Sequence, residues 1–425
     1  MSAGPPELFY DWNRRGTGGA ARVREVQFDD ETLRDGLQSP SVANPALADK
    51  LRFIHLVARL GIGSADVGMP GAGGRAGSDA EALCREIAEA RLPLRPNCAA
   101  RTVRSDILPI LEIAQRSGQT VEVAMFVGSS AIRRDVEGWP LDELLRRVDV
   151  CVGLAHRHGA PVTFVTEDTT RSHPDDLRAL YLAAVRAGAT RVCVADTAGH
   201  ATPLTVLRVV RFVRSVLREC AAEVGLDWHG HNDRGMAVAN ALTAAWAGAE
   251  RLHATALGVG ERIGNPPMEQ LLLNAALEGW AEPRLELLGE YVSLAAGMLG
   301  VEVPAGAPVV GRDAFRTSTG VHASAILKAR RSGDPRVEDL IYSAVPAAWL
   351  GRQQEIEVGP LSGAANVRCW LADHGYADDP TVVERILAAA KRADRTLNDE
   401  QLHALAGASG PNGGGSTGAG GLSGP

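Results

Sequence analysis

Residues 191–220 read RVCVADTAGHATPLTVLRVVRFVRSVLREC and hold a complete strand, turn and helix. The β-branched run 191–197 is typical of a buried strand, and from Thr202 onward apolar residues recur at three- and four-residue spacing, which indicates an amphipathic helix. Asp196 and Thr197 close the strand with polar side chains. The stretch therefore predicts one βα unit with functional groups at the carboxyl end of its strand.

The same pattern recurs along the chain with a period of about 30 residues, the size of one βα unit. Strand-like runs begin near residues 23, 64, 94, 120, 161, 191, 226 and 251, and the stretches between them are amphipathic. Eight such units predict an α/β fold of the TIM (β/α)8 barrel type. An open doubly wound sheet usually has fewer strands and a Gly-rich first turn, and no G-x-G-x-x-G follows the first run.

The regions outside this repeat have different compositions. We expect an N-terminal extension over 1–22, the barrel over 23–279, and a smaller helical C-terminal appendage over 280–405, where the pattern changes to helices and loops. Residues 406–425 are rich in glycine and serine and predict a disordered tail, because they cannot bury enough apolar surface to offset their ordering entropy.

Composition excludes several classes of protein. The net charge of the 425 residues is −7 with no basic block, so neither nucleic acid nor an anionic membrane is an expected partner. No apolar run has the length of a signal peptide core or a membrane span. The 6 cysteines are scattered and form no C-x-x-C pair, which favours a reducing, cytoplasmic location.

A second stretch, WHGHNDRG at 228–235, holds two histidines two positions apart. In an extended strand His229 and His231 point to the same face, where both imidazoles can bind one ion. Histidines satisfied by hydrogen bonds explain the pattern as well, so the spacing permits a metal site without requiring one. The carboxyl ends of barrel strands carry the active site, and further polar residues fall at such ends, namely Arg34, Asp35, Glu167, Asp168 and the loop 258–265.

Four segments together resemble the signature of one known superfamily. DETLRDGLQ (30–38), HGHNDRGMAVANAL (229–242), GVGERIGN (258–265) and TGVHASAILK (319–328) are similar to motifs of the DRE-TIM metallolyases, in their 2-isopropylmalate, citramalate and homocitrate synthase branch. The resemblance runs from about residue 25 to residue 375. It implies an acyltransferase that condenses acetyl-CoA with a 2-oxo acid in a Claisen reaction and then hydrolyses the thioester.

The resemblance places the metal ligands of this superfamily on Asp35, His229, His231 and Asn265. One carboxylate, two imidazoles and an amide oxygen leave open positions where a 2-oxo acid can chelate the ion. This mixed set of nitrogen and oxygen donors suits a divalent ion such as Mg, Mn or Zn. The alternative has Asp35 capping a helix and the histidines bonded to the backbone.

The resemblance also assigns catalytic groups. Arg34 matches the residue that steadies the developing oxyanion, with a salt bridge to Asp35 or Glu167 as the alternative role. Glu167 matches an acid that works with a histidine in proton transfer. His322 and, with looser spacing, Tyr342 match appendage residues that reach the active site of the partner subunit, which implies a homodimer. A histidine that only holds the domain junction is the alternative for His322.

Substrate contacts follow from the same comparison. Thr197, otherwise a helix cap, matches the residue that binds the substrate carboxylate, and Gln38 ends the first motif. The usual isopropylmalate pocket has His, Ser, Asn and Pro where this chain has Ala124, Val165, Cys193 and Ala195. This less polar pocket should accept a branched or larger apolar 2-oxo acid at least as well as 2-oxoisovalerate, and 2-oxoglutarate poorly. The resemblance to the branch as a whole implies 2-oxoisovalerate, and hence leucine biosynthesis, with the citramalate, homocitrate and other 2-alkylmalate synthases as alternatives. We expect Gly258 and Gly260 to shape their loop first and to contact acetyl-CoA second.

Other functions remain open at this point. Hydroxymethylglutaryl-CoA lyases share RDGLQ, but they use a cysteine in a Gly-rich loop, and the loop 258–265 has none. Dinuclear metallo-hydrolases also begin with H-x-H-x-D, although their motif continues with His where this chain has Arg234. A barrel retained only for binding is a further alternative. The chain is too short for the leucine-sensing domain of longer isopropylmalate synthases, so we expect no leucine inhibition through such a domain.

Overall fold

A computed structural model describes residues 8, 9, 11, 13, 25–220 and 222–407. The chain divides into two compact units, one from Asp11 to Gly311 and one that begins at Arg312 and also includes Leu8 and Phe9. Most of the expected N-terminal extension, 1–22, lies outside the described residues. The expected tail, 406–425, lies outside them from residue 408 onward.

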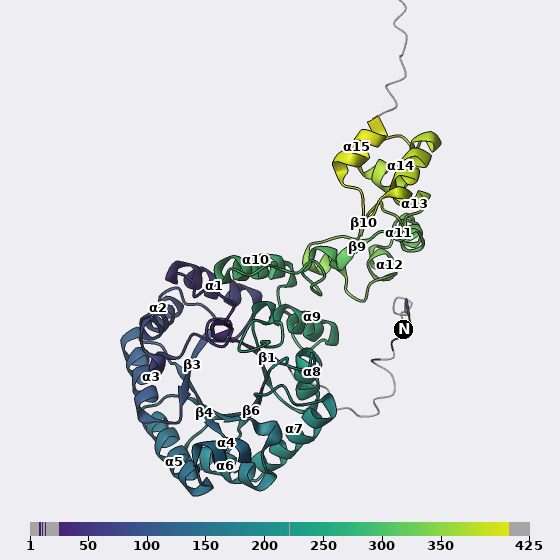
Figure 1. The fold of residues 1–425 in the computed structure, drawn as a ribbon. Coiled ribbons are helices and arrows are strands. Elements are labelled where there is room, and N and C mark those ends of the chain that lie inside the picture. The colour runs from purple at the N-terminus through teal and green to yellow at the C-terminus, as the bar shows by residue number, and fades with distance from the viewer. Residues whose placement is uncertain (1–7, 10, 12, 14–24, 221, 408–425) are drawn as a thin grey trace, which may run out of the picture. The chain divides into compact units, whose positions relative to one another are not determined.

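Within the described residues, eight parallel strands of the first unit close into a barrel, with the last strand paired to the first (Figure 1). The TIM barrel expected from the sequence is therefore confirmed. The strands are β1 (Gln27–Asp30), β2 (Ser64–Asp66), β3 (Arg95–Arg101), β4 (Glu122–Gly128), β5 (Val162–Glu167), β6 (Arg191–Asp196), β7 (Gly225–Gly230) and β8 (Arg251–Ala254).

The helices that follow these strands in the chain lie outside the barrel, as the ring in Figure 1 shows. They are α1 (Leu47–Leu60), α2 (Arg75–Glu89), α3 (Arg104–Ser117), α4 (Ala131–Glu137), α5 (Leu141–Arg157), α6 (Pro174–Ala187), α7 (Pro203–Leu217), α8 (Ala237–Ala247) and α9 (Met268–Glu278). Short 3-10 turns are η1 (Gly36–Gln38), η2 (Pro70–Ala72), η3 (Thr169–Arg171), η4 (Ala256–Gly258) and η5 (Leu285–Leu287).

The unit from β6 to α7 shows how the sequence produces this arrangement. Val192 and Val194 are fully buried, as expected for a strand covered on both faces. The helix begins at Pro203, where a proline needs no hydrogen-bond partner, and the Thr202 side chain accepts a bond from the Thr205 amide. The cap of this helix is therefore Thr202, and the alternative role of Thr197 as its cap is wrong.

Charged side chains fill the barrel interior below the strand ends. Arg251 donates to Glu122 at 2.6 Å, to Asp227 at 2.8 Å and to the Thr163 hydroxyl at 3.1 Å. Arg191 donates to the other oxygen of Asp227 at 2.8 Å. Burial opposes the charge of Asp227, but the two arginines hold its pKa far below the usual value. We call these five residues the interior charge layer.

The first unit continues past residue 279 because another helix packs on the barrel. The hydroxyl of Tyr291 on α10 (Leu288–Leu299) donates to Asp30 at 2.5 Å. Its ring stacks on Phe53 of α1, with ring centroids 5.3 Å apart. These contacts join α10 to β1 and α1, so the compact unit ends only at Gly311.

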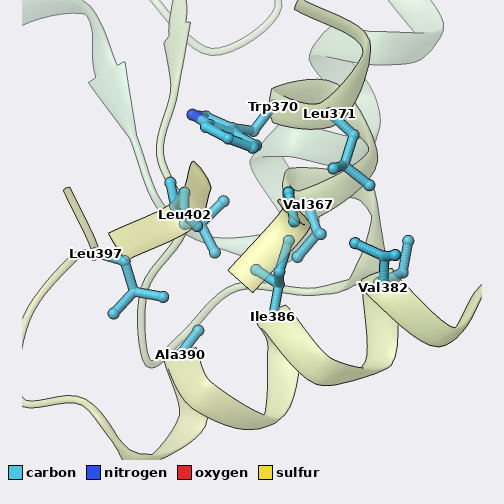
Figure 2. Packing of buried hydrophobic residues seen from close by; sticks show 11 residues of the cluster. Val367, Trp370, Leu371, Val382, Ile386, Ala390, Leu397 and Leu402 are labelled. Carbon is cyan, nitrogen blue, oxygen red and sulfur yellow. The ribbon is translucent and has the colours of Figure 1, made fainter. Parts of the chain in front are cut away.

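The second unit is mainly helical. Its elements are η6 (Arg312–Phe315), β9 (Arg316–Thr317), α11 (Gly320–Ser332), α12 (Pro335–Leu340), η7 (Ala347–Leu350), β10 (Glu355–Ile356), α13 (Ala364–Asp373), α14 (Pro380–Arg392) and α15 (Asp399–Gly407). Figure 2 shows its core, where Val367, Trp370 and Leu371 of α13 pack against Ile386 of α14 and Leu402 of α15. No helix of the described residues is both long enough and apolar enough to span a membrane.

Candidate active site

The carboxyl ends of the barrel strands enclose a cavity of about 340 Å³. Eleven of the single residues selected from the sequence line it, namely Arg34, Asp35, Gln38, Ala124, Val165, Glu167, Cys193, Ala195, Thr197, His229 and His231. They come from strands and loops spread along the whole barrel. The closed barrel thus brings these distant sequence positions to one place, as the position of the active site in this fold requires.

Asp35, His229 and His231 form a buried cluster with the geometry of a metal site. The Nε2 atoms of the two histidines lie 3.2 Å apart. Oδ2 of Asp35 lies 3.9 Å from Nε2 of His229 and 3.8 Å from Nε2 of His231. Asp35 begins η1 without making a side-chain cap, so the helix-capping alternative for this carboxylate is not observed.

These residues fit a divalent ion. Ligand atoms bound at about 2.1 Å in octahedral geometry lie about 3 Å from their neighbours, which is close to the separation of the two imidazole nitrogens. Burial and the neighbouring His229 lower the pKa of His231 to about 4, so its ring is neutral and has a free lone pair. Burial opposes the charge of Asp35, but Arg34 and the histidines lower its pKa.

Asn265 completes the cluster from the loop after β8. Its Nδ2 donates to Oδ1 of Asp35 at 2.8 Å, and its Oδ1 is buried without a hydrogen-bond partner in the described chain. A methyl group on Gly260 would lie 2.2 Å from Asn265 Nδ2 and 2.5 Å from Asp35 Oδ1. One on Gly258 (φ +68°) would lie 2.8 Å from the Asn265 carbonyl oxygen. Both glycines thus shape the loop, as expected, and their contact with acetyl-CoA stays a prediction.

Arg34 is held by three acids beside the cluster. It donates to Asp35 at 2.9 Å and to Asp66 at 2.8 Å, and it pairs with Glu31 at 2.8 Å. The alternative of a salt bridge is therefore observed, although the guanidinium also lines the cavity. Burial opposes its charge, but these carboxylates raise the pKa of Arg34 well above its usual value. The group is a fixed cation at the edge of the metal cluster.

Glu31 and His253 also line the cavity, and the sequence analysis did not select them. Oε1 of Glu31 lies 2.8 Å from Nδ1 of His253, whose Nε2 lies 3.3 Å from Asp227. Burial opposes the charge of His253, but Glu31 and Asp227 raise its pKa to about 10. The two-residue alternation of inward positions puts Arg251 and His253 on one face of β8, but no local signal pairs His253 with Glu31.

Glu167 and Thr197 also line the cavity, at the carboxyl ends of β5 and β6. Burial raises the pKa of Glu167, although Arg133 on α4 lies 3.5 Å away and opposes this shift. The Thr197 hydroxyl oxygen accepts a bond from the Asp168 amide at 2.9 Å, which leaves its proton free to be donated. Ala124, Val165 and Cys193, with neighbouring apolar residues, form the remaining wall.

His322 and Tyr342 belong to the second unit. His322 lies in the first turn of α11, and its ring stacks on the ring of Tyr342 with centroids 3.9 Å apart and planes at 21°. The structure therefore brings these two selected residues together, and their catalytic roles stay predictions.

The fold and the cavity define a TIM-barrel protein with a candidate divalent-metal centre at the carboxyl ends of its strands. The chain belongs to the family described as HMGL-like, which it matches over residues 25–288. The superfamily expected from the four motifs is therefore confirmed.

Curated relatives cover most of the chain. A probable 2-isopropylmalate synthase of Ignicoccus hospitalis is 31% identical over 87% of this chain and 88% of its own length. The homocitrate synthase AksA of Methanopyrus kandleri is also 31% identical, over 87% of this chain and 89% of its own length. A solved HMG-CoA lyase of Bacillus subtilis has a TM-score of 0.55 at 21% identity, covering 66% of this chain and 96% of that one. This last likeness concerns the fold.

Proposed function

We propose that this chain is an acyltransferase that condenses acetyl-CoA with a 2-oxo acid and releases CoA. The buried cluster of Asp35, His229 and His231 beside the fixed cation Arg34 carries the proposal, because this arrangement can receive a chelating 2-oxo acid. Relatives about 30% identical over most of the chain, named as 2-isopropylmalate, homocitrate and citramalate synthases, support the same reaction class.

The residues of the chain divide the chemistry among them. A divalent ion, when bound by Asp35, His229, His231 and Asn265, would polarise the ketone of the 2-oxo acid. A base takes a proton from the acetyl methyl group, and the resulting carbanion bonds to C2 of the 2-oxo acid. The electron pair of the C=O π bond moves to the ketone oxygen, which then takes up a proton. Water then cleaves the thioester and releases CoA.

The remaining groups assist these steps. Arg34 supplies fixed N–H donors where the ketone oxygen becomes negative. The Thr197 hydroxyl donates to the substrate carboxylate. We assign the base to His322 acting with Glu167, whose pKa is raised by burial, so that it can hold a proton closer to neutral pH than an exposed glutamate can.

We propose 2-oxoisovalerate as the 2-oxo acid, which gives 2-isopropylmalate and a role in leucine biosynthesis. The apolar wall of Ala124, Val165 and Cys193 favours a branched aliphatic side chain. Arg133 also lines the cavity, and it is already paired with Glu137 at 2.6 Å and Glu167 at 3.5 Å. The distal carboxylate of 2-oxoglutarate would have to compete with these two acids.

The free cysteines of the described chain support a reducing, cytoplasmic location.

A panel of 2-oxo acids tests the proposal. The protein is incubated with acetyl-CoA, a divalent ion and each acid in turn, CoA release is followed, and the product is identified by mass. We expect 2-oxoisovalerate to be preferred over 2-oxoglutarate, with differences of about 10- to 200-fold between aliphatic acids that differ by one methylene group. No CoA release with any acid, or cleavage of hydroxymethylglutaryl-CoA instead, would overturn the proposed reaction. One ion per chain is expected, whereas two would favour a metallo-hydrolase.

We further propose that the active protein is a homodimer in which His322 acts in the partner's site. Mixing the inactive variants His322→Ala and His229→Ala then restores activity, because each mixed dimer has one intact site. About a quarter of the normal rate is expected after complete exchange. Lack of recovery despite demonstrated subunit exchange would show that His322 acts in its own chain or not at all.

A further inference from the structure

A series of contacts between buried side chains connects the candidate metal ligands with the barrel interior. Nδ1 of His229 lies 2.9 Å from Oε2 of Glu31, and the other oxygen of Glu31 lies 2.8 Å from Nδ1 of His253. The far nitrogen of His253 contacts Asp227, which Arg251 holds at 2.8 Å. A candidate ligand is thereby connected to the interior charge layer through one carboxylate and one imidazole.

The first of these contacts, between His229 Nδ1 and Glu31 Oε2, involves two atoms that bond to no other group of the described chain. Both His229 Nδ1 and Glu31 Oε2 are buried, and neither has an aligned hydrogen bond to any atom of the described chain. They lie at hydrogen-bond distance, but the ring N–H does not point straight at the oxygen. A small rotation of the imidazole would complete this bond, and each atom would otherwise stay buried without a partner, which costs free energy.

Glu31 itself has little freedom to move. Its second oxygen faces the Arg34 guanidinium at 2.8 Å as well as His253 at 2.8 Å. Its carboxylate is therefore fixed from two sides by groups that are anchored in turn, Arg34 by Asp66 and His253 by Asp227. A carboxylate fixed in this way is suited to orient a third group.

We propose that Glu31, held in place by His253, is a positioning residue that keeps the proton of His229 on Nδ1 and so leaves the lone pair of Nε2 directed at the metal position. A histidine that binds a metal through one nitrogen commonly donates the other N–H to a carboxylate, which fixes the tautomer and the ring orientation. The proposal rests on the metal site of the proposed function and adds the residues that prepare it.

A second ion at Glu31, His229 and His253 is the competing explanation, because these three also lie close enough to bind one. Arg34 lies 2.8 Å from the same oxygen of Glu31 that faces His253. Both nitrogens of His253 already face carboxylates. A cation there would displace bonds that are already made, so the structure favours the positioning role.

Nitrogen NMR on the metal-free protein tests the tautomer directly. Ring ¹⁵N signals are recorded on histidine-labelled protein, and those of His229 are assigned by their loss in His229→Ala. We expect the proton on Nδ1 and a lone pair on Nε2. A proton on Nε2 would overturn the proposal, whether or not the protein is catalytically active.

Metal binding tests the consequence. Manganese affinity is measured by calorimetry for the wild type, Glu31→Gln and His253→Gln, with Asp30→Asn as the control because Asp30 is a buried acid next to Glu31 in the chain and bonds to Tyr291 instead of a histidine. We expect a 10- to 100-fold weaker affinity for Glu31→Gln, a smaller loss for His253→Gln, and little change for the control.

The outcomes separate the two proposals. Wild-type affinity in Glu31→Gln, or an equal loss in the Asp30→Asn control, would overturn the positioning role. Absence of manganese binding by the wild type would instead count against the metal site of the proposed function. If Glu31→Gln does not fold, His253→Gln and the tautomer measurement decide.

Discussion

The interior charge layer and the cluster of candidate metal ligands differ in how their buried polar atoms are paired. In the layer, Arg251 satisfies Glu122, Asp227 and Thr163, and none of these side chains has an unpaired polar atom. In the cluster, Oδ1 of Asn265 is buried without a partner in the described chain. Because an unpaired buried polar atom is costly, this oxygen points to a ligand, whereas the paired charges of the layer serve the fold.

The largest effect is expected from breaking the layer. Arg251→Met leaves the buried Asp227 and the partly buried Glu122 without their main cation, which should lower the free energy of unfolding by about 3 to 5 kcal/mol. Chemical denaturation measures the loss. Arg146→Met is the control, because its pairs with Asp142 and Glu143 are exposed and should contribute less than about 1 kcal/mol. Equal losses of unfolding free energy in the two variants would show that the interior charge layer contributes no more to stability than an exposed ion pair.

Substitution of a candidate metal ligand should weaken metal binding and leave folding unaffected. His229→Ala or His231→Ala should weaken metal affinity at least a hundredfold, about 2.7 kcal/mol, and abolish turnover. The melting temperature of the metal-free protein should change little, because neither ring holds the barrel together. Calorimetric titration and thermal melts are compared with those of His173→Ala, whose ring is exposed. Full activity of a metal-depleted variant would reject the site.

Glu269 on α9 is a buried carboxylic acid that belongs neither to the interior charge layer nor to the candidate metal ligands. Its carboxylate accepts the Leu257 amide at 3.1 Å, and burial raises its pKa to about 7. The native state therefore resists ionisation that the unfolded chain undergoes near pH 4.5. The stability associated with the protonated group is complete below that pH and is lost as the pH rises through about 7.

Glu269→Gln should consequently stabilise the protein at pH 8 by about 2 kcal/mol and have much less effect at pH 5. Melting temperatures of variant and wild type at the two pH values provide the measurement. Glu278→Gln, an exposed change on the same helix, serves as the control. A difference that is the same at both pH values would show that the ionisation of Glu269 does not affect folding.

The smallest effect concerns the loop that carries Asn265. Gly260→Ala places a methyl group 2.2 Å from Asn265 Nδ2, so the amide and Asp35 must shift. We expect about tenfold weaker metal affinity, about 1.4 kcal/mol, measured by the same titration. Gly279→Ala is the control for a glycine with positive φ and open space around it. Unchanged affinity in Gly260→Ala would mean that Asn265 is not a ligand.

The sequence predicts the barrel well because each strand and helix has its own local periodicity. It also selects Asp35 and the two histidines, which stand in short recognisable segments. Glu31 and His253 escape this reasoning because they are 222 positions apart and meet only when β8 pairs with β1. Nothing local distinguishes them from other charges at strand ends.

Other features depend on tertiary contacts in the same way. The choice of Thr202 over Thr197 as the cap of α7 follows from the position of Pro203, which a coarse strand and helix assignment overlooks. The membership of α10 in the first unit depends on the contact of Tyr291 with Asp30. Such contacts join segments far apart in the chain, so they are visible only in the folded molecule.

The interior charge layer also has a consequence for the order of folding events. Arg251 and Glu122 are 129 positions apart, so their bond can form only after the last strand has joined the sheet. Contacts of this kind are absent from an early transition state, because a long loop must close before they gain anything. Loss of the Arg251 contacts should therefore accelerate unfolding and leave the refolding rate nearly unchanged. The contacts of the layer would then form late in folding and slow the unfolding of a barrel that is already assembled.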